Sequence, residues 1–197
     1  MKIILDNGHG IDTPGKRSPL WSNGTQLFEW KFNRLIVDRI YEALVKKGLK
    51  VEKLVPEIFD VPVSVRAARA NKIFKRESSS FGVSIHANAL TGKPGRANGW
   101  EIWTAVGETE SDKLAECIYD KSFAHLPFKM RYDRTDGDHD KEKNYYMLYK
   151  TIGTFVLSEN GFMDNEADCQ FMQTNSGLDS IARVHVEGIF EFIKKYR

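Results

Sequence analysis

Cysteine is scarce in this chain, which has only two in 197 residues, Cys117 and Cys169. They form no Cys-x-x-Cys pair, so neither a zinc ribbon nor a disulfide framework is indicated. A chain of this length can bury a sizeable hydrophobic core and needs no cross-link to fold. We therefore expect both cysteines to be ordinary half-buried thiols.

Long apolar runs are also missing. No stretch approaches the roughly 18 consecutive apolar residues that a membrane helix needs. The first residues of the chain reach Asp6 too early for a secretory leader. We expect a protein with no membrane span and no signal peptide, which is synthesised in the cytoplasm.

Neither sign of charge is in excess. The chain has 29 Lys and Arg residues against 27 Asp and Glu residues, a formal net charge of +2. Domains that bind nucleic acid usually show a strongly basic face, so no nucleic-acid partner is expected. The sequence contains no internal repeat, no low-complexity segment and no linker, and these absences favour a single domain.

The hydrophobic pattern alternates short apolar runs with amphipathic stretches. It predicts strands at residues 2–5, 50–54, 81–86, 100–104 and 154–157. It predicts helices near residues 26–47, 64–74, 108–123, 166–173 and 179–196, and a polar loop over 124–146. Strands that alternate with helices indicate an α/β fold, a mostly parallel twisted sheet with helices on both faces.

Polar residues that can bind metal or transfer protons follow three of the predicted strands. They are His9, His86 and Glu159, and Glu29 lies near the start of the first long helix. In open α/β sheets ligands bind beyond the carboxyl ends of the strands. Two imidazoles and a carboxylate are a known ligand set for catalytic zinc, and a further carboxylate can act as the base toward water.

Each of these residues also has a structural explanation. His9 can cap the following turn, and Glu29 can be an exposed first-turn carboxylate favoured by the helix dipole. For His86 the structural and metal-binding explanations carry equal weight. Glu159 follows an apolar run, where an unpaired charge is costly, so a functional partner or a raised pKa is expected.

Three motifs together resemble the amidase type 3 family, the zinc-dependent N-acetylmuramoyl-L-alanine amidases. Residues 5–10 (LDNGHG) are similar to the family's Asp-x-Gly-His-Gly, which supplies the first zinc histidine. Residues 84–89 (SIHANA) are close to the signature of the second histidine. Residues 159–165 (ENGFMDN) resemble the Glu-x-Gly-Phe-x-x-Asn segment that carries the catalytic glutamate.

Other segments extend the resemblance from residue 3 to the last predicted helix. Glu29, at the head of the first helix, resembles the glutamate ligand. Residues 66–71 (RAARAN) resemble the Arg-rich helix before the third strand, although the arginines at 66 and 69 can equally be structural. Residues 99–102 (GWEI) resemble the Gly-x-Glu strand that follows.

The resemblance implies an enzyme that hydrolyses the amide between N-acetylmuramic acid and the L-alanine of the peptidoglycan stem peptide. It implies one Zn²⁺ ion held by His9, Glu29 and His86, with Glu159 as the catalytic base. Asn88, just beyond His86, is a candidate substrate-binding residue. The expected partner is peptidoglycan or a muropeptide, and the expected state is a monomer.

We expect residues 1–197 to form one catalytic amidase domain without a separate cell-wall-binding module. The setting that fits is a phage or prophage endolysin released to the wall, or an exported bacterial enzyme whose leader is absent. Two alternatives remain open at this point. One is a zinc amidohydrolase of the same fold that acts on another peptide-like amide, and the other is a non-catalytic peptidoglycan-binding module.

Two departures from the family pattern stand out. Ser158 and Asn160 flank the proposed base where apolar residues are usual, which predicts an effect on the pKa of Glu159. The loop 133–144 matches no motif of the family. It is rich in acids, among them Asp136, Asp138 and Asp140, and we expect a solvated loop at the rim of the site.

Overall fold

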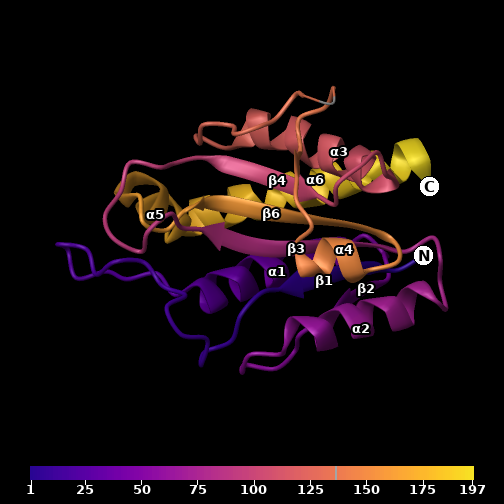
Figure 1. Ribbon diagram of the computed structural model, residues 1–197, viewed down its shortest axis with the longest axis horizontal. Coiled ribbons are helices and arrows are strands. Elements are labelled where there is room, and N and C mark those ends of the chain that lie inside the picture. The colour runs from indigo at the N-terminus through magenta and orange to yellow at the C-terminus, as the bar shows by residue number, and fades with distance from the viewer. Residues whose placement is uncertain (136) are drawn as a thin grey trace.

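The structure, a computed structural model, describes residues 1–135 and 137–197 (Figure 1). Asp136, one of the acids singled out in the sequence, lies outside the described residues. No helix in the described part of the chain has both the length and the apolar character needed to cross a membrane.

The centre of the molecule is one six-stranded sheet with the strand order β2-β1-β3-β6-β4-β5. All neighbouring strands are parallel except the pair β4 and β6, which is antiparallel. The prediction of a single α/β domain with a mostly parallel sheet is therefore confirmed. The strands span Ile3–Asn7 (β1), Val51–Lys53 (β2), Phe81–Asn88 (β3), Trp100–Thr104 (β4), Lys141–Glu142 (β5) and Thr154–Phe162 (β6).

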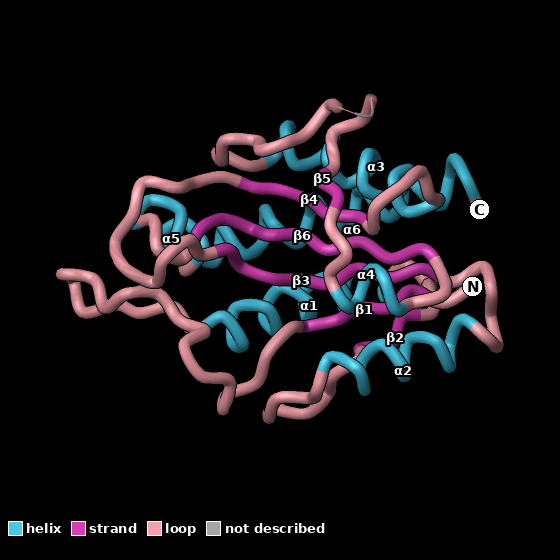
Figure 2. The backbone as a smooth tube through the Cα atoms, in the orientation of Figure 1, coloured by secondary structure: helices cyan, strands magenta, loops and turns pink. Residues whose placement is uncertain are grey.

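Helices cover both faces of the sheet, as Figure 2 shows. One core joins side chains of α1, α3, α5 and α6 to one face, and a second core joins α2 and α4 to the other. The helices span Glu29–Lys46 (α1), Val63–Phe74 (α2), Glu110–His125 (α3), Tyr146–Lys150 (α4), Glu166–Met172 (α5) and Asn175–Tyr196 (α6).

Alternation along the strands decides which side chains reach the α2 and α4 face. In β6, Phe155 and Leu157 belong to the core under α2 and α4, whereas Val156 belongs to the other core. Continuing this period of two places Glu159 on the α2 and α4 side. In β3 the same rule applies, because Val83 and Ile85 face the larger core and His86 therefore faces the opposite side.

The structure differs from the sequence prediction in its strand lengths. β6 runs on to Phe162, so Glu159 lies inside a strand rather than after one, and β3 continues past the predicted end at His86 to Asn88. The predicted loop 124–146 contains β5 and leads into α4. Polar residues interrupt the apolar pattern in these segments, so the pattern underestimates how far the strands extend.

The two cysteines are more deeply placed than the sequence indicated. Both are free and buried rather than half-buried. Cys169 accepts a hydrogen bond from Trp21 Nε1 at 3.2 Å. Burial raises the pKa of both thiols, which keeps them protonated and unreactive.

Candidate active site and metal group

The turn after β1 aims His9 toward the end of β3. His9 has a φ of 67°, a left-handed conformation that is uncommon outside glycine. Its neighbour Gly8 has no room for a side chain, because a Cβ atom there would lie 1.9 Å from His86 Cε1. Arg34 donates to the His9 carbonyl oxygen at 2.8 Å, and Asn33 donates to that of Gly8 at 3.0 Å. Helix α1 thus holds the strained turn in place.

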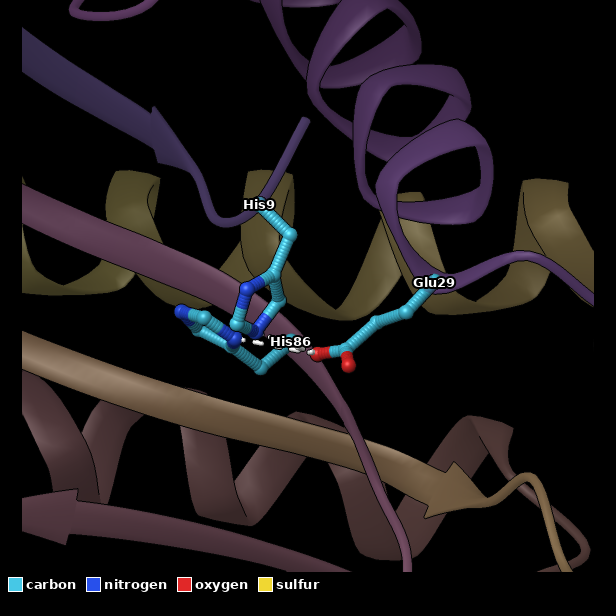
Figure 3. A group of neighbouring side chains, drawn as sticks. All are labelled: His9, Glu29 and His86. Atoms are coloured by element: carbon cyan, nitrogen blue, oxygen red, sulfur yellow. Dashed lines mark hydrogen bonds and ion pairs between the residues drawn. The ribbon is translucent and has the colours of Figure 1, made fainter. Parts of the chain in front are cut away.

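Glu29 is the first residue of α1, and its side chain is only 1% exposed. Its Oε1 atom lies 3.1 Å from His86 Nδ1 and 3.4 Å from His9 Nε2. Figure 3 shows the three side chains pointing toward one another from β3, α1 and the turn after β1. One potential ligand atom from each lies within 4.8 Å of the others, so the structure brings together the three residues predicted to bind metal.

A fourth residue, Lys16, approaches this group and was not anticipated from the sequence. Its Nζ atom lies 3.8 Å from Glu29 Oε2. That oxygen is buried and accepts no hydrogen bond. Lys16 comes from the irregular segment between β1 and α1, and nothing in its local sequence distinguishes it from an exposed lysine.

The charges in the group suit cation binding. Burial lowers the pKa of His9 to about 4, and the nearby Glu29 carboxylate only partly opposes that shift. Burial pushes the pKa of Glu29 up, but the hydrogen bond from His86 and the charges of His86, His9 and Lys16 outweigh it, so the pKa is lowered. At neutral pH the group therefore offers a neutral His9 imidazole and an ionised carboxylate, the forms that coordinate metal.

Glu159 lies beside this group in the sheet. In the strand register it is paired with His86 of β3 and with Glu101 of β4. Burial raises its pKa well above the usual value, the negative charges of Glu29 and Glu101 raise it further, and Lys16 opposes the shift. Its Oε2 atom is buried and accepts no hydrogen bond, which leaves it available to a substrate or a water molecule.

The residues that flank Glu159 face the other side of the sheet. Asn160 donates to the His86 carbonyl oxygen at 3.1 Å and accepts from Trp100 Nε1 at 2.8 Å. Ser158 Oγ lies 2.8 Å from His185 Nε2, beneath α6. Ser158 and Asn160 are not among the groups that shift the pKa of Glu159, so the predicted effect on that pKa is not found. Their hydrogen bonds instead fix the position of β6 next to β3 and α6.

Glu101 accepts hydrogen bonds from four side chains at the same edge of the site. Asn88 donates to its Oε1 atom at 2.7 Å, and Arg131 and Lys141 bind its Oε2 atom at 2.9 and 3.0 Å. Trp103 Nε1 donates at 3.2 Å. Asn88, predicted as a substrate-binding residue, thus has its amide group committed to Glu101. The Gly-x-Glu motif was the one signal in the sequence that pointed to Glu101.

The two arginines of α2 have structural contacts. Arg66 donates to Asp6 Oδ2 at 2.6 Å, and Ser84 donates to the same oxygen at 2.5 Å. Arg69 forms a two-pronged pair with Glu57, with N···O distances of 2.6 and 2.9 Å. These contacts tie α2 to β1 and to the loop after β2, which supports the structural explanation of both residues.

The segment after Glu159 anchors the loop between β3 and β4. Asp164 Oδ2 accepts hydrogen bonds from the backbone N–H groups of Leu90, Thr91 and Gly92 at 2.8, 2.9 and 3.3 Å. Asp168 accepts from Gly99 at 2.8 Å. The loop that borders the site is therefore held by the same motif that carries Glu159.

The fold and the site define an α/β protein with a candidate metal group of the kind that metal-dependent hydrolases use. A family model described as N-acetylmuramoyl-L-alanine amidase matches residues 3–191, and the chain belongs to this family. It is an amidase that hydrolyses the cell wall.

Similarity to individual proteins supports the assignment. The chain is 27% identical over 191 residues to N-acetylmuramoyl-L-alanine amidase CwlM of Bacillus licheniformis, covering 96% of this chain and 67% of that protein. It is 27% identical over 199 residues to the endolysin of Bacillus phage SPP1, covering 97% of this chain and 65% of that protein. The crystal structure of an N-acetylmuramoyl-L-alanine amidase from Clostridium difficile 630 superposes with a TM-score of 0.83 at 23% identity, covering 100% of this chain and 98% of that one.

Proposed function

We propose that His9, Glu29 and His86 hold one zinc ion and that Glu159 is the general base of the amidase reaction. The bond cleaved is the amide between N-acetylmuramic acid and the L-alanine of the stem peptide. The observation that carries the proposal is the convergence of one potential ligand atom each of His9, Glu29 and His86 within 4.8 Å, beside Glu159.

The donor set fits zinc. Two imidazole nitrogens with one carboxylate are typical of catalytic zinc sites, and harder cations prefer an all-oxygen set. The buried Glu29 Oε2 atom accepts no hydrogen bond, and so it retains coordinating capacity. When bound, zinc acts as a Lewis acid toward the scissile carbonyl and lowers the pKa of a water molecule from about 16 to about 7.

Glu159 supplies the proton transfers. As a carboxylate it accepts the proton of the attacking water, and as a carboxylic acid it passes that proton to the departing L-alanine amine. Burial raises its pKa, which favours uptake of the proton from water, and its Oε2 atom accepts no competing hydrogen bond. The Asn160 hydrogen bond to the backbone of His86 keeps β6 and β3 in register at this point.

Peptidoglycan or a muropeptide is the substrate that we propose for this site, with Asn88 and Glu101 at its edge. A monomer suffices, because all four proposed residues come from one chain. The similarity to the endolysin of Bacillus phage SPP1 supports a released lysin that acts at the cell wall, and the similarity to CwlM of Bacillus licheniformis supports the other setting, an exported bacterial enzyme. We further propose that residues 1–197 act as a single catalytic domain, since the six strands of the described residues all belong to one sheet.

The test is to incubate the zinc-loaded protein with purified sacculi and to identify the products by mass. Free stem peptides that begin with L-alanine are expected. Replacing His86 with Ala should remove both the bound zinc and the activity. Replacing Glu159 with Gln should retain the zinc but slow turnover by about 10² to 10⁴-fold. A Glu159→Gln variant with wild-type turnover, or a His86→Ala variant with full zinc, contradicts the assigned roles.

A further inference from the structure

A second group of possible metal ligands lies away from the active site. Glu116 of α3 meets Asp138 and Asp140, which precede β5. One carboxylate oxygen from each lies within 4.8 Å of the others. Asp138 and Asp140 belong to the acidic loop that matches no family motif, so the amidase reaction leaves this cluster without a role.

Asp140 is the residue in this cluster that points to a ligand. It is only 1% exposed, although the loop was expected to be solvated. Thr104 donates to its Oδ2 atom at 2.5 Å, while its buried Oδ1 atom accepts no hydrogen bond. Among the described residues, no lysine or arginine forms an ion pair with Asp140. A buried carboxylate oxygen without a donor is costly, and a bound cation removes that cost.

The surroundings are crowded with negative charge. Burial raises the pKa of Asp140 to about 8. The hydrogen bond with Asp138 and the charges of Asp138 and Asp112 add to the shift, and the Thr104 hydrogen bond opposes it. Glu116 is already oriented by His139, whose backbone N–H donates to its Oε1 atom at 2.7 Å and whose Nδ1 atom lies 3.0 and 3.1 Å from its two carboxylate oxygens. The cluster thus has a fixed ligand on the helix and a buried ligand beside the sheet.

We propose that Glu116, Asp138 and Asp140 form a second cation site, distinct from the His9, Glu29 and His86 group, which binds Ca²⁺. Three carboxylates are a hard-oxygen ligand set, which favours calcium or magnesium over zinc. Calcium is the better match, because it accepts irregular geometry and completes its coordination with water, whereas magnesium requires a nearly ideal octahedron.

Such an ion clamps the acidic loop to α3. The clamp reaches the active-site edge through the next residue, because Lys141 Nζ donates to Glu101 Oε2 at 3.0 Å and Glu101 pairs with Glu159 in the sheet. The role is structural, and it does not depend on the proposed zinc chemistry.

Thermal unfolding of the zinc-loaded protein tests the site. About 10 mM CaCl₂ should raise Tm by roughly 3 to 6 °C relative to NaCl of equal ionic strength, for a Kd on the order of 10⁻³ M. Isothermal titration with CaCl₂ alone should show one site. Asp140→Asn and Glu116→Gln should abolish the shift. The matched control Asp120→Asn, an exposed acid of α3 outside the cluster, should retain it.

Two results overturn the proposal. One is a wild-type Tm that responds equally to CaCl₂ and NaCl, which is expected if Asp138 and Asp140 simply share a proton. The other is a calcium shift that survives in Glu116→Gln and disappears in His86→Ala, which places the ion in the first group. If Asp140→Asn does not fold, Glu116→Gln alone tests the site, because Glu116 is partly exposed and its substitution should leave the fold intact.

Discussion

At the scale of single residues, the active site depends on close backbone approach. His9 reaches its position because the turn adopts a φ of 67°, and His86 lies where a side chain on Gly8 would otherwise be. Strain of this kind persists only when the surroundings impose it, here through Asn33 and Arg34 of α1.

Replacing Gly8 with Ala should therefore displace His86 and weaken metal binding by at least tenfold, with a matching loss of activity. The added methyl group would lie 1.9 Å from His86 Cε1, well inside van der Waals contact. Zinc titration with a competing chelator measures the effect. Gly95→Ala is the control, because its Cβ would meet backbone oxygens only at 3.6 Å or beyond. Equal zinc affinities in the two variants contradict this explanation.

His185 is a second residue whose environment has a measurable consequence. It is fully buried, with Nδ1 2.8 Å from the Ile181 carbonyl oxygen and Nε2 facing Ser158. Burial lowers its pKa from 6.5 to about 4, and the Ile181 hydrogen bond opposes this only partly. The folded protein therefore keeps this imidazole neutral where the unfolded chain protonates it.

The pKa of His185 is lower in the folded protein than in the unfolded chain. Its contribution to the free energy of unfolding is therefore complete above pH 6.5 and is lost as the pH falls toward 4. The loss should approach about 3 kcal/mol of unfolding free energy, at about 1.4 kcal/mol per pKa unit. Urea unfolding of zinc-loaded protein at several pH values measures it. His185→Gln, which keeps a donor and an acceptor, should show a shallower slope between pH 6.5 and 4, and identical slopes would exclude this origin.

At the scale of elements, β6 and the residues after it have two functions. β6 carries Glu159 into the site, and the residues that follow it hold the β3–β4 loop through Asp164. Since three backbone N–H groups share one carboxylate oxygen, the loop depends heavily on this residue.

Replacing Asp164 with Ala should free the β3–β4 loop and lower the unfolding free energy by about 1 to 3 kcal/mol, because three part-buried backbone N–H groups lose a charged acceptor. Limited trypsin digestion should then cut faster after Arg96, an exposed residue of this loop. Asn98→Ala, which removes a hydrogen bond within the loop to the Arg96 carbonyl oxygen, is the control. Digestion of Asp164→Ala at the control rate would show that the anchor is dispensable.

At the scale of the whole molecule, the framework rests on two hydrophobic cores rather than on the candidate metal group. The cores lie on opposite faces of the sheet and join its strands to the helices through apolar side chains. The fold should therefore persist without metal, while the chemistry should not.

A chelator should abolish turnover on sacculi and lower Tm by roughly 5 to 10 °C, the effect of removing a ligand present at about 100 times its Kd. The far-UV circular dichroism spectrum should be unchanged. Zinc addition should restore both activity and Tm. Loss of secondary structure on chelation would show that the metal is required for folding.

Much of this architecture was predictable from the sequence. Apolar periodicity placed the five longer strands and most helices, because side-chain spacing reflects local geometry. Motif resemblance indicated His9, Glu29, His86 and Glu159, and the structure brings them together. Asn88 remains a prediction, and its amide group bonds to Glu101.

Local pattern could not indicate Lys16 beside Glu29, the donors gathered on Glu101, or the meeting of Glu116 with Asp140. These pairs join residues far apart in the chain, and their side chains look like ordinary surface charges in sequence. The sequence by itself determined the order of elements and the residues able to do the chemistry. Only the tertiary structure decided which of them meet, because contact across a sheet depends on strand order, register and the face each side chain occupies.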